Sequence, residues 1–403
     1  MVKNKRSALN IAMGGAFLMA MSAVGPGFLT QTATFTSQLG ADFGFAILIC
    51  ILVDIGVQLN IWRIIVVSGK KAQTIANELV PGLGYLLTVL IVLGGLTFNI
   101  GNIGGVGLGF NVLFGISPEN GALIGGAIAL VIFLVRNALV VMDRTVQVLA
   151  VIKVLLIIFI ISVMAPPVGV AAVHTFLPSH IDFYSIVTIV GGTVGGYISF
   201  SGGHRLLEGG LRGPNAIRVV NGGALTGVGV ASLIRILLFL AGLAVITAGY
   251  KLNPLNPAAS IFQAAAGTFG YKFFGLILLA AGMTSTLGST FTSVSFLDYS
   301  KVNGDHHIYQ KLRPYLIVFF IVFSTAVFYF VGSPAKVLVI VGAINGLILP
   351  IALAILLIAS MRKKIMGEAY KHPLWLTLFG WIIVLFMAYA GVQTVAKSLS
   401  SLL

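Results

Sequence analysis

Residues 20–32 read AMSAVGPGFLTQT, and this stretch interrupts a long apolar segment near its centre. The apolar segment extends from about residue 8 to residue 37, whereas one straight membrane crossing needs about 20 residues. Pro26 removes a backbone hydrogen-bond donor, and the flanking Gly25 and Gly27 relax helical geometry. The sequence therefore predicts a helix that is broken near Gly25, at the depth of a membrane.

A second interruption occurs in residues 189–203, which read IVGGTVGGYISFSGG. It follows the first by about 170 residues, and each interruption opens a block of five apolar spans. Because five is odd, the two blocks are expected to have opposite orientations in the membrane. Broken helices at matching positions of inverted repeats indicate a transporter site at the bilayer midplane. The alternative is that these glycines only allow helices to pack closely.

The composition supports a membrane protein. Of the 403 residues, 58% are hydrophobic and 8% are charged, whereas soluble domains carry roughly 25% charged residues. This excludes a soluble enzyme and a disordered chain, and the long apolar runs exclude a transmembrane barrel. We predict an all-α integral membrane protein with eleven transmembrane helices. The predicted spans are about 8–37, 43–67, 83–114, 121–136, 146–166, 183–206, 222–249, 271–297, 314–332, 336–361 and 374–397.

These spans form one transmembrane domain over residues 1–403. Its first repeat is expected at about 8–166, its second at about 183–362, and one further helix at about 374–397. The segment 254–270 carries Pro254 and Pro257, so we expect a loop there and the approach to the eighth span. The apolar run that begins at Ala8 continues past Ala23, which is too long for a cleaved signal peptide and predicts an uncleaved first span.

The net charge of +14 follows from membrane orientation and does not indicate a nucleic-acid partner. Most basic residues lie on the side of the N-terminus, which is therefore predicted to be cytoplasmic, with the C-terminus outside. The chain is expected in the cytoplasmic membrane as a multi-pass protein. The outer segments carry chiefly Lys251, Lys336 and Lys397. The inner basic residues are Lys3, Lys5, Arg6, Lys70, Lys71, Arg136, Arg144, Arg205, Arg212, Arg218, Lys301, Lys311, Arg313, Arg362, Lys363, Lys364 and Lys371.

Several motifs, in their order and spacing, resemble the NRAMP family of divalent-metal transporters over nearly the whole chain. The resemblance implies a LeuT/APC-type 5+5 inverted repeat with broken helices 1 and 6, plus one extra helix. It also implies secondary transport by alternating access. The motifs are GADFGF at 40–45, GIS at 115–117, GTV at 192–194, AGMTST at 281–286 and RKKIMG at 362–367.

The functional residues of the family are not found at the matching positions. The family motif Asp-Pro-Gly-Asn falls on Gly25–Phe28, and Met-Pro-His falls on Gly195–Tyr197. The glutamine of the family's tenth span aligns with Gly342, and its proton-pathway acids fall on Asn99 and Asn102. Divalent ions need oxygen ligands, usually charged, and soft sulfur favours transition metals. We therefore predict no metal site and no cofactor.

The amides at the start of each half-helix favour an anion instead, and in this fold they often receive a substrate carboxylate. We predict import of a small organic solute, a carboxylate or an amino-acid derivative, with H⁺ or Na⁺ as a possible coupling ion. The resemblance suggests 5-oxoproline, because divergent relatives tend to be encoded near 5-oxoproline-degrading enzymes. The predicted substrate-binding residues are Gly25, Gly27, Phe28, Gln31, Thr32, Gly195, Gly196, Tyr197, Ser199, Ser201, Asn99, Asn102, Thr284 and Arg235.

Several alternatives remain at this stage. Arg235 is either a substrate counter-ion or the structural partner of Asp54, with equal weight, because charge at membrane depth needs a partner. His204, Arg205 and Glu208 either gate the inner exit or mark a charged helix end. The alternative function is a divalent cation transporter for Mg²⁺ or Mn²⁺, and a non-transporting membrane sensor is a third class. No motif of an enzyme occurs outside the membrane spans, so we do not expect an enzyme.

Overall fold

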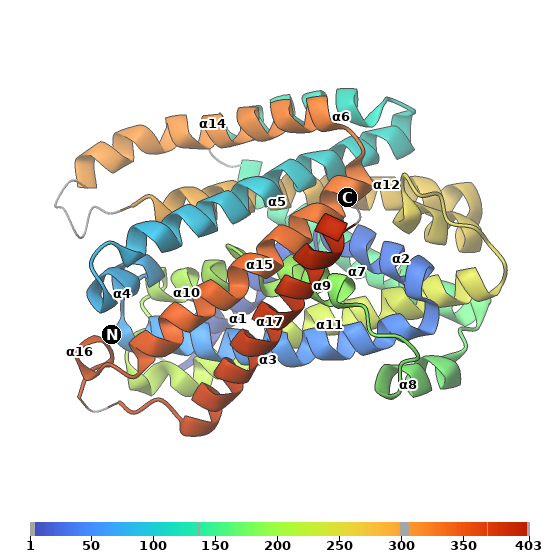
Figure 1. Cartoon of the computed structure of the whole chain (residues 1–403). Helices are drawn as coiled ribbons and strands as arrows, with labels where there is room; N and C mark the ends of the chain where they lie inside the picture. Colours follow the sequence, from blue (N-terminus) through green and yellow to red (C-terminus); the bar gives the residue numbers. More distant parts are fainter. Residues whose placement is uncertain (1–4, 135–137, 299–305, 369, 401–403) are drawn as a thin grey trace.

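The computed structural model describes residues 5–134, 138–298, 306–368 and 370–400, and these residues form helices without any strand among them (Figure 1). Lys3, Arg136 and Lys301 lie outside the described residues. The helices, with two short 3-10 turns, are α1 Lys5–Ala23, α2 Pro26–Leu39, η1 Gly40–Asp42, α3 Phe43–Ser68, α4 Ala72–Leu79, α5 Leu83–Phe114, α6 Pro118–Leu134, α7 Ala138–Met164, α8 Val168–Phe176, α9 Phe183–Val194, α10 Ile198–Glu208, η2 Pro214–Ala216, α11 Ile217–Thr247, α12 Pro257–Phe296, α14 His306–Val331, α15 Pro334–Ser360, α16 Lys363–Met366 and α17 Leu374–Ser400.

Each predicted span coincides with a helix or with a broken pair of helices. Eight segments in the described chain are long and apolar enough to cross a membrane, or nine if α7 and α8, bent by 109°, count as one broken span. The all-helical membrane fold is therefore confirmed, whereas the number of eleven crossings stays a prediction. The short helices α4 and α8 were not expected from the hydropathy.

The expectation of a loop over 254–270 is wrong for most of that segment, because α12 begins at Pro257. Asn256 caps the helix with a side-chain oxygen that accepts from the Ala259 amide at 3.2 Å, and proline is tolerated in the first helical turn. The helix is kinked at Ala266 and Gly267, where the Gly267 φ is +58°. The prolines thus start a helix that continues, after the kink, into the eighth span.

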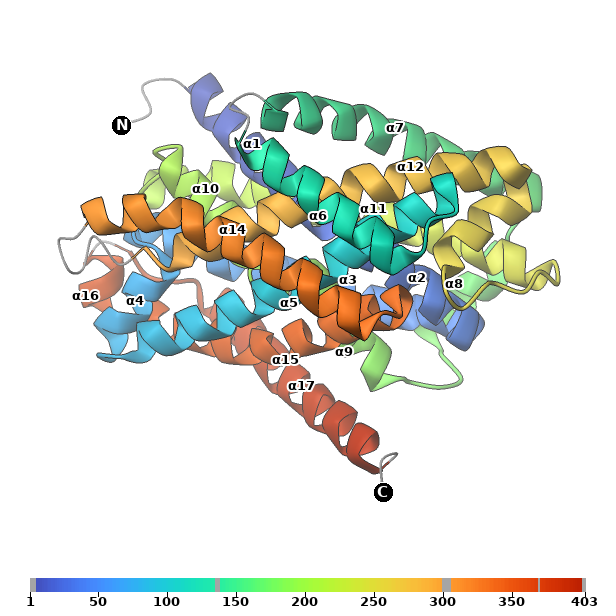
Figure 2. The same ribbon diagram turned by 90° about the horizontal axis from the view of Figure 1, so that it is seen from above.

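The two broken helices lie side by side and run in opposite directions. The first consists of α1 and α2, and the second consists of α9 and α10. The half-helix α1 packs against α10, and α2 packs against α9. Helices α3, α5, α11, α12 and α15 surround this pair (Figures 1 and 2). The predicted interruptions near Gly25 and Gly195 are both confirmed.

The helices run roughly parallel to one direction, which defines two ends of the molecule (Figure 1). The start of α1, the helix α4 and the helix α16 lie at the left end in this view. The helix α8 and the end of α2 lie towards the right end. Both breaks therefore lie between the ends, in the interior of the bundle.

Candidate functional site

At the first break, the chain between α1 and α2 becomes extended at Gly25, with φ −86° and ψ −171°. Gly25 faces α5 and α12: a Cβ atom there would lie 2.9 Å from the Ser285 hydroxyl oxygen and 3.6 Å from the Asn102 Oδ1. The Ser285 hydroxyl and the Asn102 Nδ2 are buried and have no hydrogen-bond partner in the structure. A small neutral polar region therefore faces the first break.

At the second break, Gly195 is extended and Gly196 adopts a left-handed conformation with φ +53°. A Cβ atom at Gly196 would collide with the side chain of Asn345 on α15. The Asn345 Nδ2 is held by the carbonyl oxygens of Gly94, at 3.2 Å, and Val341, at 2.9 Å. Glycine is required at 196 both for its backbone conformation and for this close approach.

Gln31 joins the two broken helices to α15. Its Nε2 donates to the Leu338 carbonyl at 2.8 Å, and its Oε1 is buried without a partner. Gly192 on α9 and Gly342 on α15 face the same side chain, and a Cβ atom at either position would collide with it. Gln31 therefore occupies space that two glycines leave open, next to the position where the family has a glutamine on its tenth span.

Arg235 on α11 is buried, with 2% of its surface exposed. Its guanidinium carbon lies 4.1 Å from the centre of the Phe28 ring, as in a cation–π contact. Its Nη1 donates to the Cys50 Sγ at 3.0 Å and to the Ile189 carbonyl at 3.3 Å. Its Nε and Nη2 are buried and have no partner, so most of its donor capacity is unused.

Asp54 on α3 is equally buried, at 2% exposure. Its Oδ2 accepts from the Cys50 thiol at 3.5 Å, and its Oδ1 has no partner. Among the described residues, no ion pair within 4.0 Å joins Asp54 to Arg235. The two residues instead line one pocket, together with Phe28, Cys50, Ile51, Thr193, Ala231 and Ser232.

This pocket lies beside both breaks, because Phe28 follows Gly25 closely in α2 and Thr193 precedes Gly195 closely in α9. The direct Asp54–Arg235 pair, which the sequence left open, is not formed. Instead, Cys50 Sγ contacts both charged side chains.

Three other predicted site residues form side-chain hydrogen bonds within their own helix. The hydroxyls of Thr32, Ser201 and Thr284 donate to the carbonyls of Phe28, Ile198 and Ala280 at 2.7–2.8 Å. The Ser199 hydroxyl donates to the Val194 carbonyl across the second break. On α12, Ser285 and not Thr284 faces Gly25, because neighbouring residues on a helix point in directions about 100° apart.

Two predicted residues bridge neighbouring helices near the second break. Asn99 accepts from the Ser289 hydroxyl at 2.9 Å and donates to the Ser324 hydroxyl at 3.2 Å, so it joins α5 to α12 and α14. Tyr197 is buried, and its ring packs edge-on against Phe98 with centroids 5.4 Å apart. Neither residue lines the pocket of Arg235.

The site residues predicted from the sequence do not include Cys50, Asp54, Thr193 and Ser285. Asp54 carried a signal, since it is an acid in an apolar segment, and Cys50 precedes it by one helical turn. Thr193 and Ser285 carried no such signal in the sequence, because small hydroxyl residues are common in membrane helices.

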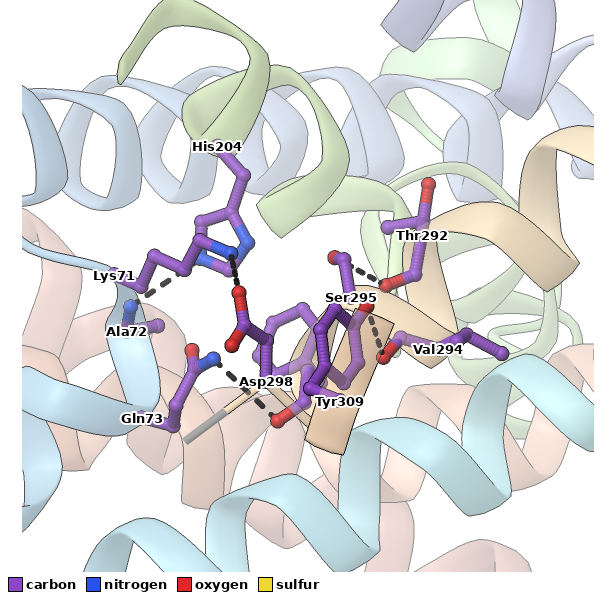
Figure 3. Close-up of polar contacts among 10 residues, drawn as sticks. Lys71, Ala72, Gln73, His204, Thr292, Val294, Ser295, Asp298 and Tyr309 are labelled. Carbon is purple, nitrogen blue, oxygen red and sulfur yellow. Dashed lines mark hydrogen bonds and ion pairs between the residues drawn. The ribbon is translucent and has the colours of Figure 1, made fainter. Parts of the chain in front are cut away.

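The C-terminal end of α10 is contacted by α4 and by the end of α12 (Figure 3). The His204 ring stacks on Phe296 with centroids 4.7 Å apart, and its Nε2 accepts from the Ala72 amide at 3.2 Å. Gln73 donates to the Phe296 carbonyl at 3.4 Å, and Lys71 pairs with Asp298 at 3.5 Å. His204 is thus part of a packed cluster that closes this end.

Within the part of the chain that the structure describes, no group of three or more His, Cys, Asp or Glu side chains could hold a metal ion. The pocket beside the breaks contains one carboxyl group and one guanidinium group, and the polar region facing Gly25 contains neutral groups.

Comparisons with known proteins agree on the family. The model described as natural resistance-associated macrophage protein-like matches residues 16–397. The chain is 52% identical to the uncharacterized membrane protein YcsG of Bacillus subtilis, over 99% of this chain and 97% of that protein. It is 24% identical to the divalent metal cation transporter MntH of Klebsiella pneumoniae, over 92% of this chain and 90% of that protein.

Solved structures show the same fold at low sequence identity. The manganese transporter of Eremococcus coleocola superposes with a TM-score of 0.74 at 18% identity, covering 98% of this chain and 88% of that chain. The structure of MhsT in complex with L-phenylalanine superposes with a TM-score of 0.61 at 15% identity, covering 98% of both chains.

Proposed function

Because the chain belongs to the natural resistance-associated macrophage protein-like (NRAMP) family of transporters, we propose that it imports a small organic anion by alternating access around its two broken helices. The observation that carries this proposal is Arg235, a buried guanidinium beside both breaks with two unpaired donor nitrogens. An intramembrane charge without a full set of partners marks a substrate pathway.

The chemistry of the pocket favours a carboxylate at Arg235. A planar guanidinium binds a carboxylate through two parallel hydrogen bonds, and Nε and Nη2 are the two nitrogens left free. The same positive charge repels a divalent cation, with little screening away from water. The N-terminus of α2, which begins at Pro26, adds a partial positive charge beside Phe28.

A divalent cation such as Mn²⁺ or Mg²⁺ is the second candidate, and the comparisons favour it. The relative MntH is a divalent metal cation transporter, and a manganese transporter has a similar fold. Neutral oxygens such as Gln31 Oε1 and Asn102 Oδ1 lie near the breaks. Divalent ions are held by oxygen ligands, so the experiment below includes both ions.

The proposed transport cycle uses the whole chain as one domain. We propose two repeats, about 8–166 and 183–362, related by inversion, with the helix at 374–397 added. The antiparallel arrangement of α1/α2 and α9/α10 supports this division. Rocking of one repeat against the other would then expose the breaks to either side in turn, coupled to H⁺ or Na⁺.

The test is transport by the purified protein in liposomes. We expect saturable uptake of labelled 5-oxoproline or an amino acid and no saturable entry of Mn²⁺ or Mg²⁺. The variant Arg235→Gln should reduce uptake at least about tenfold, because it removes a charge-assisted bidentate contact. The matched control is Arg218→Gln, since Arg218 is an exposed arginine at the start of the same helix, α11. Saturable Mn²⁺ entry without uptake of any carboxylate would overturn the proposal in favour of the second candidate.

A further inference from the structure

Asp42 ends the η1 turn between α2 and α3, and its carboxylate binds a segment that lies 132 to 138 residues further along the chain. Its Oδ1 accepts from the His174 Nδ1 at 2.6 Å and from the Ser179 amide at 2.9 Å. Its Oδ2 accepts from the His180 amide at 3.2 Å. Hydrogen bonds to a charged acceptor are roughly twice as strong as those between neutral groups. One carboxylate therefore holds the connection from α8 to α9 with three bonds.

This contact joins the neighbouring ends of the two broken helices. Asp42 lies three residues after the end of α2, and His180 lies three residues before the start of α9. The contact is found near α8, at the end of the molecule opposite to the start of α1 (Figure 1). From there, α2 and α9 both lead to their breaks. Separation of α2 from α9 at this end would therefore require this contact to open.

Two glycines bring the joined segments close together. Gly40 turns the chain after α2 with a φ of +55°, a conformation that glycine adopts without steric cost. A Cβ atom at Gly44, in the first turn of α3, would collide with the side chain of Thr175 on α8. The helix α8 thus packs directly on the start of α3. The backbone geometry and the three hydrogen bonds specify the same contact.

The contact has the strength and the exposure of one that can open and re-form. The side chains of Asp42 and His174 are 15% and 30% exposed, so water can reach both when they separate. The states of a transporter differ little in free energy, and a contact formed in only one of them shifts their populations. The loss of such a contact then changes the population of the open state by about tenfold.

We propose that Asp42, His174, Ser179 and His180 form a clamp, which holds the ends of α2 and α9 together and keeps the interior closed at this end of the molecule. The clamp opens when the transporter admits a solute from this side, and it forms again when this side closes. The inference rests on the alternating access of the proposed function, but it does not depend on which solute is transported.

Cys50 reports whether this end of the interior is open. It is the only cysteine of the chain and is 1% exposed, and its Sγ lies 3.8 Å from the Thr193 Oγ1 on α9. It follows Asp42 by eight residues, about 12 Å along a helix, whereas Ser68 at the other end of α3 is about 27 Å away. Movement of α9 away from α3 at the clamp would therefore expose Cys50 first from this side.

The test measures the rate at which a membrane-impermeant thiol reagent labels Cys50 from either side of vesicles that contain the full-length protein. The variant Asp42→Ala removes all three bonds, so we expect labelling about tenfold faster from one side and no faster from the other. The variant His174→Leu removes one bond and should have a smaller effect. His174→Asn should keep the wild-type rate, because its side-chain amide can still donate to Asp42.

The control is Glu119→Gln, which changes an acid in the first turn of α6, outside the clamp, and should leave the rate unchanged. The double variant Asp42→Ala/His174→Leu should be labelled no faster than Asp42→Ala, since the bond between the two residues is already lost.

Three results would overturn the clamp. They are an unchanged labelling rate in Asp42→Ala, faster labelling from both sides, which indicates general loosening, and a lower melting temperature without any change in sidedness. Because labelling needs no solute, the clamp is tested separately from the proposed function. Failure of wild type to take up any carboxylate would overturn the proposed substrate, whereas the labelling rates would still decide whether Asp42 closes this end.

Discussion

Gly196 and Gln31 show how single residues fix the geometry of the breaks. Gly196 turns the chain with a positive φ directly against Asn345. Gln31 fills the space that Gly192 and Gly342 leave open. The breaks therefore depend on close packing of glycines against two side-chain amides, those of Asn345 and Gln31. A segment that only lacked helix-forming residues would not need this packing.

The substitution Gly196→Ala should destabilise the protein and reduce uptake. A side chain at a left-handed position costs about 1–3 kcal/mol, and the new Cβ atom would also displace Asn345. Thermal unfolding in detergent and uptake in liposomes measure the two effects. The control Gly222→Ala lies on an exposed helical position with open space around it, so it should be neutral. Equal stability of the two variants would contradict this account.

The residues of the site were only partly predictable from the sequence. The glycine–proline pattern located both breaks, because these residues interrupt a helix in any context. The choice of Thr284 over Ser285, and the missed role of Cys50, depend on how neighbouring helices are rotated about their axes. That rotation is set by packing between distant segments, and a single sequence contains little information about it.

At the scale of elements, the C-terminal end of α10 is held by stacking and polar contacts with α4 and α12. Phe296 is buried, and its ring contacts two others. Its ring centroid lies 4.7 Å from that of His204 and 5.6 Å from that of Phe200. If α9/α10 moves during the transport cycle proposed above, these contacts have to open. The cluster in Figure 3 therefore fixes the C-terminal end of α10 against α4 and α12.

The variant Phe296→Leu keeps most of the buried volume but removes the aromatic stacking, which is worth about 0.5–1.5 kcal/mol for each pair. We expect faster amide hydrogen exchange in residues 198–208 and 72–79, and unchanged exchange in α17. The control Phe319→Leu changes an exposed ring on α14 and should leave these rates as in wild type. Faster exchange spread over all helices would indicate general destabilisation and would contradict a local closure.

The connection before α17 contains a histidine that responds to pH. His372 Nε2 lies 2.9 Å from the Asn60 Oδ1, and its Nδ1 lies 3.1 Å from the Tyr370 hydroxyl. A neutral ring satisfies both contacts by donating to Asn60 and accepting from Tyr370. Burial, and then the positive charge of Arg63, lower the pKa of His372 from 6.5 to about 4.

The unfolded chain therefore binds a proton at His372 before the folded protein does. This contribution to stability is fully present above pH 6.5 and is lost as the pH falls from 6.5 towards 4. We expect the melting temperature in detergent to decrease over this range, and the variant His372→Gln to show a shallower decrease. The same slope in both proteins would show that other groups are responsible.

At the scale of the whole molecule, the fold was predictable because the apolar spans and the two helix breaks are recognisable in the sequence. They remain recognisable although the residues at the site differ from the family's motifs. The chain has an all-helical NRAMP-type fold, although the residues at both breaks differ from the family's motifs. The start of α12 was not predicted, because a proline fits both a loop and the first turn of a helix. The helix α8 was not predicted, because a segment of nine residues is too short for its hydropathy to distinguish a helix from a loop.

The distribution of charge predicts the orientation of the whole chain. Lys70, Lys71 and the basic run at 362–364 belong to segments near α4 and α16, at the same end of the molecule as the start of α1 (Figure 1). Basic segments stay in the cytoplasm, so we expect this end to be cytoplasmic and the end of α17 to be external. Alkaline phosphatase, which is active only when exported, should be active when fused after Leu403 and inactive when fused after Lys371. The reverse pattern would contradict the orientation, and replacing Arg362, Lys363 and Lys364 with glutamine should weaken the difference between the two fusions.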